Sequence, residues 1–78
     1  MHSLAIGDMI KLTAIDVSGI KYKDWLSERT PMPGDIARVD AVYEGNPITY
    51  QLCCEPKTGF IVWGALIPEN YIEYEVIK

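Results

Sequence analysis

Glycine and proline divide this chain into segments that are too short for long helices. Turn sequences fall at Pro33-Gly34, at 44–47 and at 56–59, and Pro68 interrupts the chain once more. Between the turns, apolar and polar residues alternate with the two-residue period of a strand, and a helical period is nearly absent. Such punctuation is typical of short strands joined by turns, so we expect an all-β fold.

The alternation predicts five strands. They are, in chain order, Asp8–Ile15, Asp35–Tyr43, Ile48–Glu55, Phe60–Ile67 and Tyr71–Ile77. In the second strand we expect Ala37, Val39, Ala41 and Tyr43 to point inward. In the third, Cys54 is predicted to be a core residue and Cys53 to be exposed, since neighbouring side chains of a strand lie on opposite faces. The fourth is apolar on both faces, which predicts a central strand or one covered on its second side.

The chain has 78 residues, which corresponds to one small domain spanning 1–78. Five short strands bury both faces and protect their edges most simply as a small, strongly bent, partly open barrel. The polar stretch from Asp16 to Pro33 is predicted to be a long first loop. Within its 22–29 portion we expect one or two helical turns, with Tyr22, Trp25 and Leu26 on one face.

Charge and residue types exclude several classes of function. Seven basic residues against eleven acidic ones give a net charge of −4, which argues against nucleic-acid binding. The lone His2 and the adjacent Cys53 and Cys54 indicate neither a metal site, a disulfide nor a nucleophile, so we expect no enzyme and no cofactor. Neither a secretory signal nor an apolar run long enough for a membrane helix is seen, which predicts a cytoplasmic protein.

Two segments carry a resemblance to a known family. Residues 33–39, Pro-Gly-Asp-Ile-Ala-Arg-Val, and residues 67–72, Ile-Pro-Glu-Asn-Tyr-Ile, resemble the second strand and the C-terminal Pro-x-Asn-Tyr segment of Src-homology-3 domains, of a distant bacterial or phage type. The resemblance implies a tight helical turn before the last strand, and a ligand groove that includes Pro68, Asn70 and Tyr71. It also implies that residues 16–33 occupy the position of the family's acidic recognition loop.

The family's first-strand aromatic pair has no counterpart at 12–16, and its groove tryptophan has none at 49–51. The resemblance therefore transfers the fold more readily than the ligand, because a fold does not confer its best-known function.

A second set of candidate residues comes from the long loop and the fourth strand. Trp25 lies beside Asp24 and Glu28, and a tryptophan flanked by acids suits a proline or a basic side chain. Two other interpretations stay open: Trp25 belongs to a lid over one end of the barrel, and Trp63 belongs to the core. The candidate partner-binding residues are Tyr22, Asp24, Trp25, Glu28, Trp63, Pro68, Asn70 and Tyr71.

These features favour a non-catalytic protein-interaction module. We expect it to bind a proline-rich or basic peptide between the 16–33 loop and the 68–71 turn, with Asp16 and the other loop acids supplying complementary charge. The alternative is a structural or assembly subunit, as a homo-oligomer or in a larger complex of phage or mobile-element type, with 60–67 as its interface. An acidic mimic of nucleic acid is a weaker third reading, because −4 is a low charge for such a protein.

Overall fold

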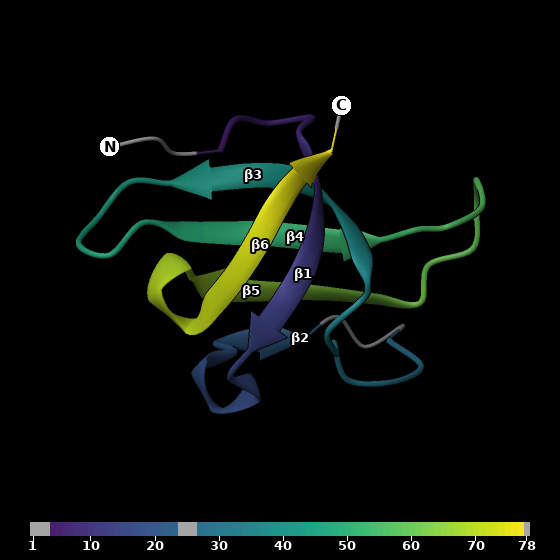
Figure 1. The fold of residues 1–78 in the computed structure, drawn as a ribbon, viewed down its shortest axis with the longest axis horizontal. Helices are drawn as coiled ribbons and strands as arrows, with labels where there is room; N and C mark the ends of the chain where they lie inside the picture. Colours follow the sequence, from purple (N-terminus) through teal and green to yellow (C-terminus); the bar gives the residue numbers. More distant parts are fainter. Residues whose placement is uncertain (1–3, 24–26, 78) are drawn as a thin grey trace.

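The computed structural model describes residues 4–23 and 27–77, and these form an all-β fold, as predicted (Figure 1). The strands are β1 (Met9–Ile15), β2 (Tyr22–Lys23), β3 (Ile36–Tyr43), β4 (Thr49–Cys54), β5 (Trp63–Pro68) and β6 (Ile72–Ile77). Two 3-10 helices, η1 (Val17–Gly19) and η2 (Glu69–Tyr71), complete the described elements. None of the described helices is long and apolar enough to cross a membrane.

All six strands belong to one antiparallel sheet with the order β2-β5-β4-β3-β1-β6. The sheet is open, with β2 and β6 at its two ends, and it bends so that β1 and β6 cross in front of β3, β4 and β5 (Figure 1). The described chain therefore has six strands rather than the predicted five. The additional strand, β2, is only two residues long, and a pair of residues is too short to show an alternation.

The helical turns predicted within 22–29 are wrong for their first part, because Tyr22 and Lys23 are strand residues paired with Leu66 and Ala65. Asp24, Trp25 and Leu26 lie outside the described residues. The 3-10 helix of the long loop comes earlier, at η1. It begins there because the Asp16 side chain caps it by accepting a hydrogen bond from the backbone N–H of Ser18.

The core fills the concave side of the bent sheet. The alternation predicted for the first and third strands is confirmed at Ile10, Leu12, Tyr50 and Leu52, all of which are fully buried. Of the two alternatives predicted for the fourth strand, the central position is the correct one, since β5 lies between β4 and β2. The other buried apolar residues of the core are Leu4, Ala37, Val39, Cys54, Trp63, Ala65, Ile67 and Ile72.

Two predictions about β3 and β4 are wrong. A register shift between Val39 and Ala41 reverses the alternation in β3, so that Val42 packs against the core and Tyr43 is 53% exposed. Cys53, predicted to be exposed, is buried because β4 has strands on both sides, with Arg38 and Gly64 as its paired residues.

The start of the fourth strand is also later than predicted. Phe60 bridges to Lys57 within a turn and is 45% exposed, and β5 begins only at Trp63.

Candidate functional site

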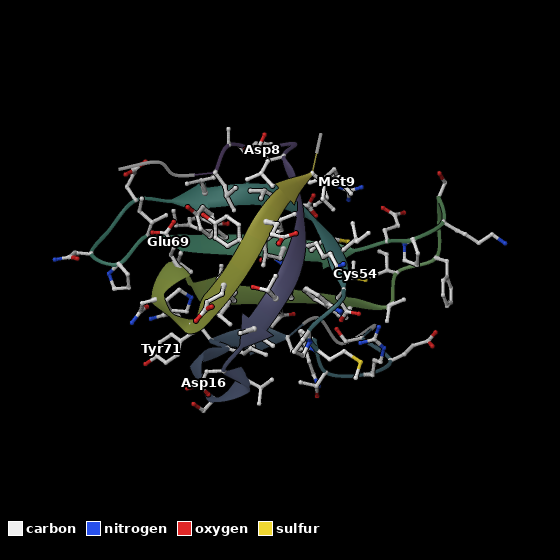
Figure 2. All side chains as sticks on the ribbon, viewed as in Figure 1. Asp8, Met9, Asp16, Cys54, Glu69 and Tyr71 are labelled. Carbon is white, nitrogen blue, oxygen red and sulfur yellow. The ribbon has the colours of Figure 1, made fainter. Side chains whose placement is uncertain are left out.

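The candidate site surrounds Tyr71, the last residue of η2 (Figure 2). Two hydrogen bonds fix η2 to the central sheet: the N–H of Glu69 donates to the Ile48 carbonyl (2.7 Å), and the Tyr50 hydroxyl donates to Glu69 Oε2 (2.7 Å). Burial, together with the neighbouring Glu69, raises the pKa of Tyr50 to about 12, so its hydroxyl keeps the donated proton at neutral pH. The helical turn that presents Tyr71 is thus anchored from within the core.

The Tyr71 side chain lies directly on Gly19 of η1. A Cβ atom added at Gly19 would overlap the tyrosine ring, so the ring occupies space that glycine leaves open. The backbone N–H of Asp16 donates to the Tyr71 carbonyl at 2.8 Å and holds the two 3-10 helices together. Although supported in this way, the tyrosine remains 36% exposed.

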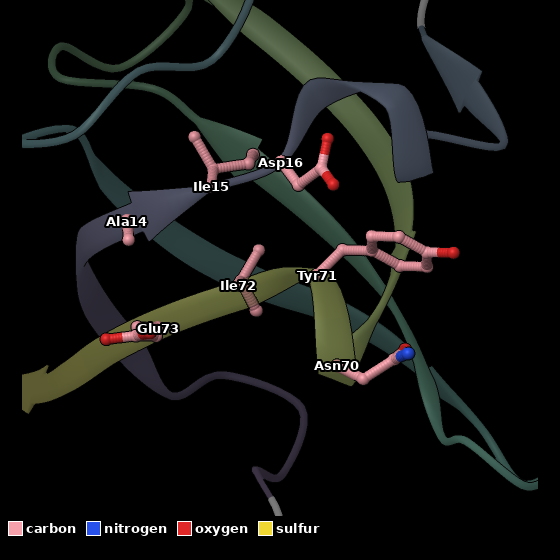
Figure 3. A pocket seen from close by; sticks show the side chains of 7 residues that line it. All are labelled: Ala14, Ile15, Asp16, Asn70, Tyr71, Ile72 and Glu73. Carbon is pink, nitrogen blue, oxygen red and sulfur yellow. The ribbon is translucent and has the colours of Figure 1, made fainter.

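An acidic hollow of about 360 Å³ lies on one side of Tyr71 (Figure 3). The charged residues in its described lining are Asp16 and Glu73, and both are acidic. Hydrogen bonds from the hydroxyl and the backbone N–H of Ser18, at 2.6 and 3.0 Å, lower the pKa of Asp16 and keep it ionised. Figure 3 shows the Asp16, Tyr71 and Asn70 side chains projecting toward the same side. The full lining is Ala14, Ile15, Asp16, Asn70, Tyr71, Ile72 and Glu73.

A second hollow of about 470 Å³ lies on the other side of Tyr71, between η1 and the turn that joins β3 to β4. Asn70 and Tyr71 line both hollows, so the two adjoin along the tyrosine. Among the described residues that line the second hollow, Lys21 is the only charged one. Its lining is Ser18, Gly19, Ile20, Lys21, Asn46, Pro47, Thr49, Pro68, Asn70 and Tyr71. We call the two hollows together the Tyr71 groove.

The structure brings only part of the predicted site together. Pro68, Asn70 and Tyr71 line the Tyr71 groove, and Asp16 joins them from the long loop. The other two described loop candidates lie elsewhere. Tyr22 is 55% exposed beside Leu66, and Glu28 bonds through its N–H to the Val62 carbonyl, near the opposite end of β5 from Pro68.

Asp24 and Trp25 lie outside the described residues. Of the described part of the long loop, the first residues therefore border the groove, whereas Tyr22 and Glu28 do not.

Trp63 does not belong to the candidate site, because its side chain is fully buried. Its indole Nε1 donates a hydrogen bond to Asp35 Oδ2 at 2.8 Å. Arg29 binds the same carboxylate through both guanidinium nitrogens, at 2.8 and 2.9 Å, and the Met32 N–H donates at 3.0 Å. Burial alone would raise the pKa of Asp35, but these hydrogen bonds outweigh it and lower the pKa. The interpretation of Trp63 as a core residue is correct.

Sequence reasoning missed the residues that complete the groove from a distance. Gly19, Lys21 and Glu73 looked like ordinary loop and strand residues, and Asn46 and Pro47 were recognised only as a turn. Nothing local marks them, since their role comes from the fold that places the 44–47 turn beside η1. Asp35 also had no signal beyond its position after Pro33-Gly34.

No set of three or more His, Cys, Asp or Glu side chains in the described ranges 4–23 and 27–77 is arranged to hold a metal ion. Comparison with protein-family models, with curated proteins and with solved structures found no match to this chain. The functional assignment accordingly depends on the geometry of the Tyr71 groove.

Proposed function

We propose that this chain is a non-catalytic interaction module that binds a peptide segment along the Tyr71 groove. The observation that carries the proposal is one exposed aromatic ring, supported by Gly19, between an acidic hollow and a proline-lined one. A rigid tyrosine offers a large contact area at a small loss of conformational entropy, which is why such rings are frequent in recognition surfaces.

The two halves of the groove suit different side chains of one peptide. Asp16 and Glu73 attract a lysine or arginine, and exposed charge pairs of this kind mainly raise the association rate and the specificity. On the other side, Ile20, Pro47 and Pro68 join the Tyr71 ring in forming a surface for a proline or a small apolar residue. Because Lys21 lies only on this second side, the charge difference along the groove would set the direction of the bound peptide.

We further propose that the fold is of the Src-homology-3 type. In support, β1 is followed by a long loop, then β3, β4 and β5 in succession, and then η2 leads into β6. The tight helical turn implied by the resemblance corresponds in position to η2. The described groove differs from the family pattern in having a single aromatic residue, Tyr71, which favours short peptides bound weakly.

The proposal is tested by titrating the protein with a library of proline-rich, arginine-containing peptides, followed by amide NMR shifts. We expect at least one peptide to bind more tightly than about 1 mM, with shifts concentrated at 16–21, 46–49 and 68–73. Tyr71→Ala should reduce its affinity about tenfold, since a central aromatic anchor is worth more than 1 kcal/mol. Phe60→Ala is the matched control, because Phe60 is a similarly exposed aromatic outside the groove. Failure of every peptide to bind, or equal effects of the two substitutions, would contradict the proposal.

A specific observation also supports assembly as a second candidate function, although on a different surface from 60–67. The residues of β5 are mostly buried within the chain and are not free for an interface. Instead, Met9, Ile36 and Ile77 form an exposed apolar group on the outer face of β1, β3 and β6, where Met9 pairs with Ile77 and Ile36 pairs with Lys11. Light scattering distinguishes the two functions, since the assembly reading requires an oligomer that Ile36→Glu dissociates.

A further inference from the structure

The backbone groups near the two ends of the open sheet differ in whether another segment pairs with them. At one end, the long loop covers the edge of β5 along most of its length. The Lys21 N–H donates to the Leu66 carbonyl, and β2 pairs with Leu66 and Ala65. The Ser27 hydroxyl bonds to both the N–H and the C=O of Gly64, at 3.1 and 3.4 Å. The backbone groups that β5 would otherwise expose are therefore occupied.

The other end of the sheet is β6, and among the described residues its one strand partner is β1. Gly7 and Asp8, which precede β1, do not serve as a second partner, because they bond to Val39 of β3. Four of the six β6 residues, Glu73, Glu75, Val76 and Ile77, are exposed. Every second residue of a strand directs its N–H and C=O away from a given neighbour, so β6 presents a row of these groups at its outer edge.

We propose that the outer edge of β6 is a second binding surface, which accepts an extended segment of a partner protein as an added strand. The segment that fits alternates lysine or arginine with apolar residues. An added antiparallel strand sets its side chains opposite those of β6, so one set meets Glu73 and Glu75 and the other meets Tyr74 and Val76. Within the sheet, Lys11 lies opposite Glu75, but Glu73 lies opposite Ala14, so the acidic side keeps an excess of negative charge.

The same charges argue against a second copy of this chain as the occupant. If two β6 strands paired and kept both cores on the same face, residues of like parity would stand opposite one another. Glu73 and Glu75 would then face glutamates of the other copy, and like charges directly opposite are destabilising. The glutamates thus protect the edge from self-association while leaving it open to a basic strand.

This surface goes beyond the proposed peptide groove, and it recognises its partner by a different chemistry. Binding in the groove depends on the Tyr71 ring and Asp16, whereas strand addition depends on backbone hydrogen bonds and therefore protects amides of β6. Glu73 lines the acidic hollow as well, so amide protection rather than affinity alone separates the two surfaces.

The test uses a synthetic peptide of alternating lysine and valine, with hydrogen exchange of the β6 amides as the readout. We expect slower exchange at amides within 72–77 when the peptide is added. A peptide of the same composition with its lysines in one block, and one with a central proline, should bind much more weakly because neither can complete the ladder. Exchanging both glutamates, in Glu73→Lys/Glu75→Lys, should weaken binding about tenfold and favour a peptide of alternating glutamate and valine.

Three results would overturn the proposal. The first is that the alternating peptide does not bind. The second is binding without slower exchange in β6, with NMR shifts confined to the neighbourhood of Tyr71 and Asp16, which would assign the peptide to the groove. The third is protection of β6 that grows with protein concentration in the absence of peptide, which would make a second copy the occupant. Tyr71→Ala separates this proposal from the preceding one, because it should leave the protection of β6 unchanged.

Discussion

The molecule combines an aspartate with an aromatic residue in two places, and the two pairs behave differently. Asp35 and Trp63 are buried, and the carboxylate accepts hydrogen bonds from the indole, from Arg29 and from the backbone of Met32. Asp16 and Tyr71 are on the surface, where Ser18 is the one described hydrogen-bond donor to the carboxylate. A largely buried carboxylate whose two oxygens both accept hydrogen bonds holds parts of the fold together. A carboxylate that faces an open hollow is still accessible to a partner.

The comparison shows the same residue types in two environments: the buried pair stabilises the fold, and we propose that the surface pair takes part in recognition. Burying a carboxylate is costly unless it is paired, and Asp35 meets this requirement with four donor groups. Those contacts join the 29–35 segment to β5, so Asp35 connects the end of the long loop to the core. Asp16 makes only short-range side-chain bonds, and its connection to η2 is made by its backbone N–H.

The largest expected effect comes from breaking the buried pair. Asp35→Ala removes the acceptor of Arg29 and Trp63 and leaves the indole N–H buried without its partner. Leaving a buried donor without its acceptor costs about 1–3 kcal/mol, and the lost hydrogen bonds from Met32 and from the partly exposed Arg29 add to this cost. The total is a large part of the free energy of unfolding of a small domain. Urea unfolding followed by tryptophan fluorescence measures the loss. Asp16→Ala should cost much less, and equal losses for the two variants would contradict the division of roles.

The pH dependence of stability tests the role of Asp35 in a second way. The pKa of Asp35 is lowered in the folded protein relative to the unfolded chain, so its contribution to stability is present above the unfolded value near 4. That contribution is lost as the pH falls through the lowered folded value. Thermal unfolding between pH 2 and pH 6 should therefore show a falling Tm for the native protein. The fall should be smaller in Asp35→Asn, and an unchanged pH dependence in that variant would count against the assignment.

A smaller loss of stability is expected from a substitution at Gly19, on which the Tyr71 ring lies. Gly19→Ala places a methyl group where the Tyr71 ring lies, and such overpacking costs about 1–2 kcal/mol if the ring cannot move freely. The variant should also weaken peptide binding, because the displaced ring no longer stands between the two hollows.

The double variant Gly19→Ala/Tyr71→Ala serves as the control for this overlap. Without the ring the alanine should cost little, so the two changes should be strongly non-additive in urea unfolding. Additive losses would mean that the ring does not depend on Gly19 for its position.

The smallest effect on stability is expected from Asp16→Asn. Asparagine caps a helix about as well as aspartate, so η1 and the Tm should be retained while the negative charge is lost. Affinity for an arginine-containing peptide should fall several-fold, and its dependence on salt should weaken. Glu28→Gln is the matched control, since Glu28 is exposed and lines neither hollow of the groove. If Asp16→Asn left the salt dependence of the peptide affinity unchanged, the charge of Asp16 would have no part in binding.

Features of this structure that depend on neighbouring residues in the chain could be predicted from the sequence, and features that depend on distant residues could not. Alternation along the chain was sufficient to predict the all-β class, the five longer strands and the core faces at Ile10, Leu12, Tyr50 and Leu52. It failed at Tyr43, where a register shift reversed the faces, and at β2, which has too few residues to show a pattern. Of the residues that line the Tyr71 groove, Pro68, Asn70, Tyr71 and Asp16 were named from the sequence as site candidates. Trp63 was assigned to a surface that it does not reach.

The sequence by itself determined where strands and turns lie, because period and turn residues act over a few neighbours. Only the tertiary structure decided which side chains meet. It brought Gly19 under Tyr71, the 44–47 turn beside η1, and Trp63 onto Asp35, 28 residues away in the chain. It also decided that the long loop covers the outer edge of β5, whereas β6 pairs with β1 alone among the described residues. These outcomes depend on the order of strands in a bent sheet, which no local pattern contains.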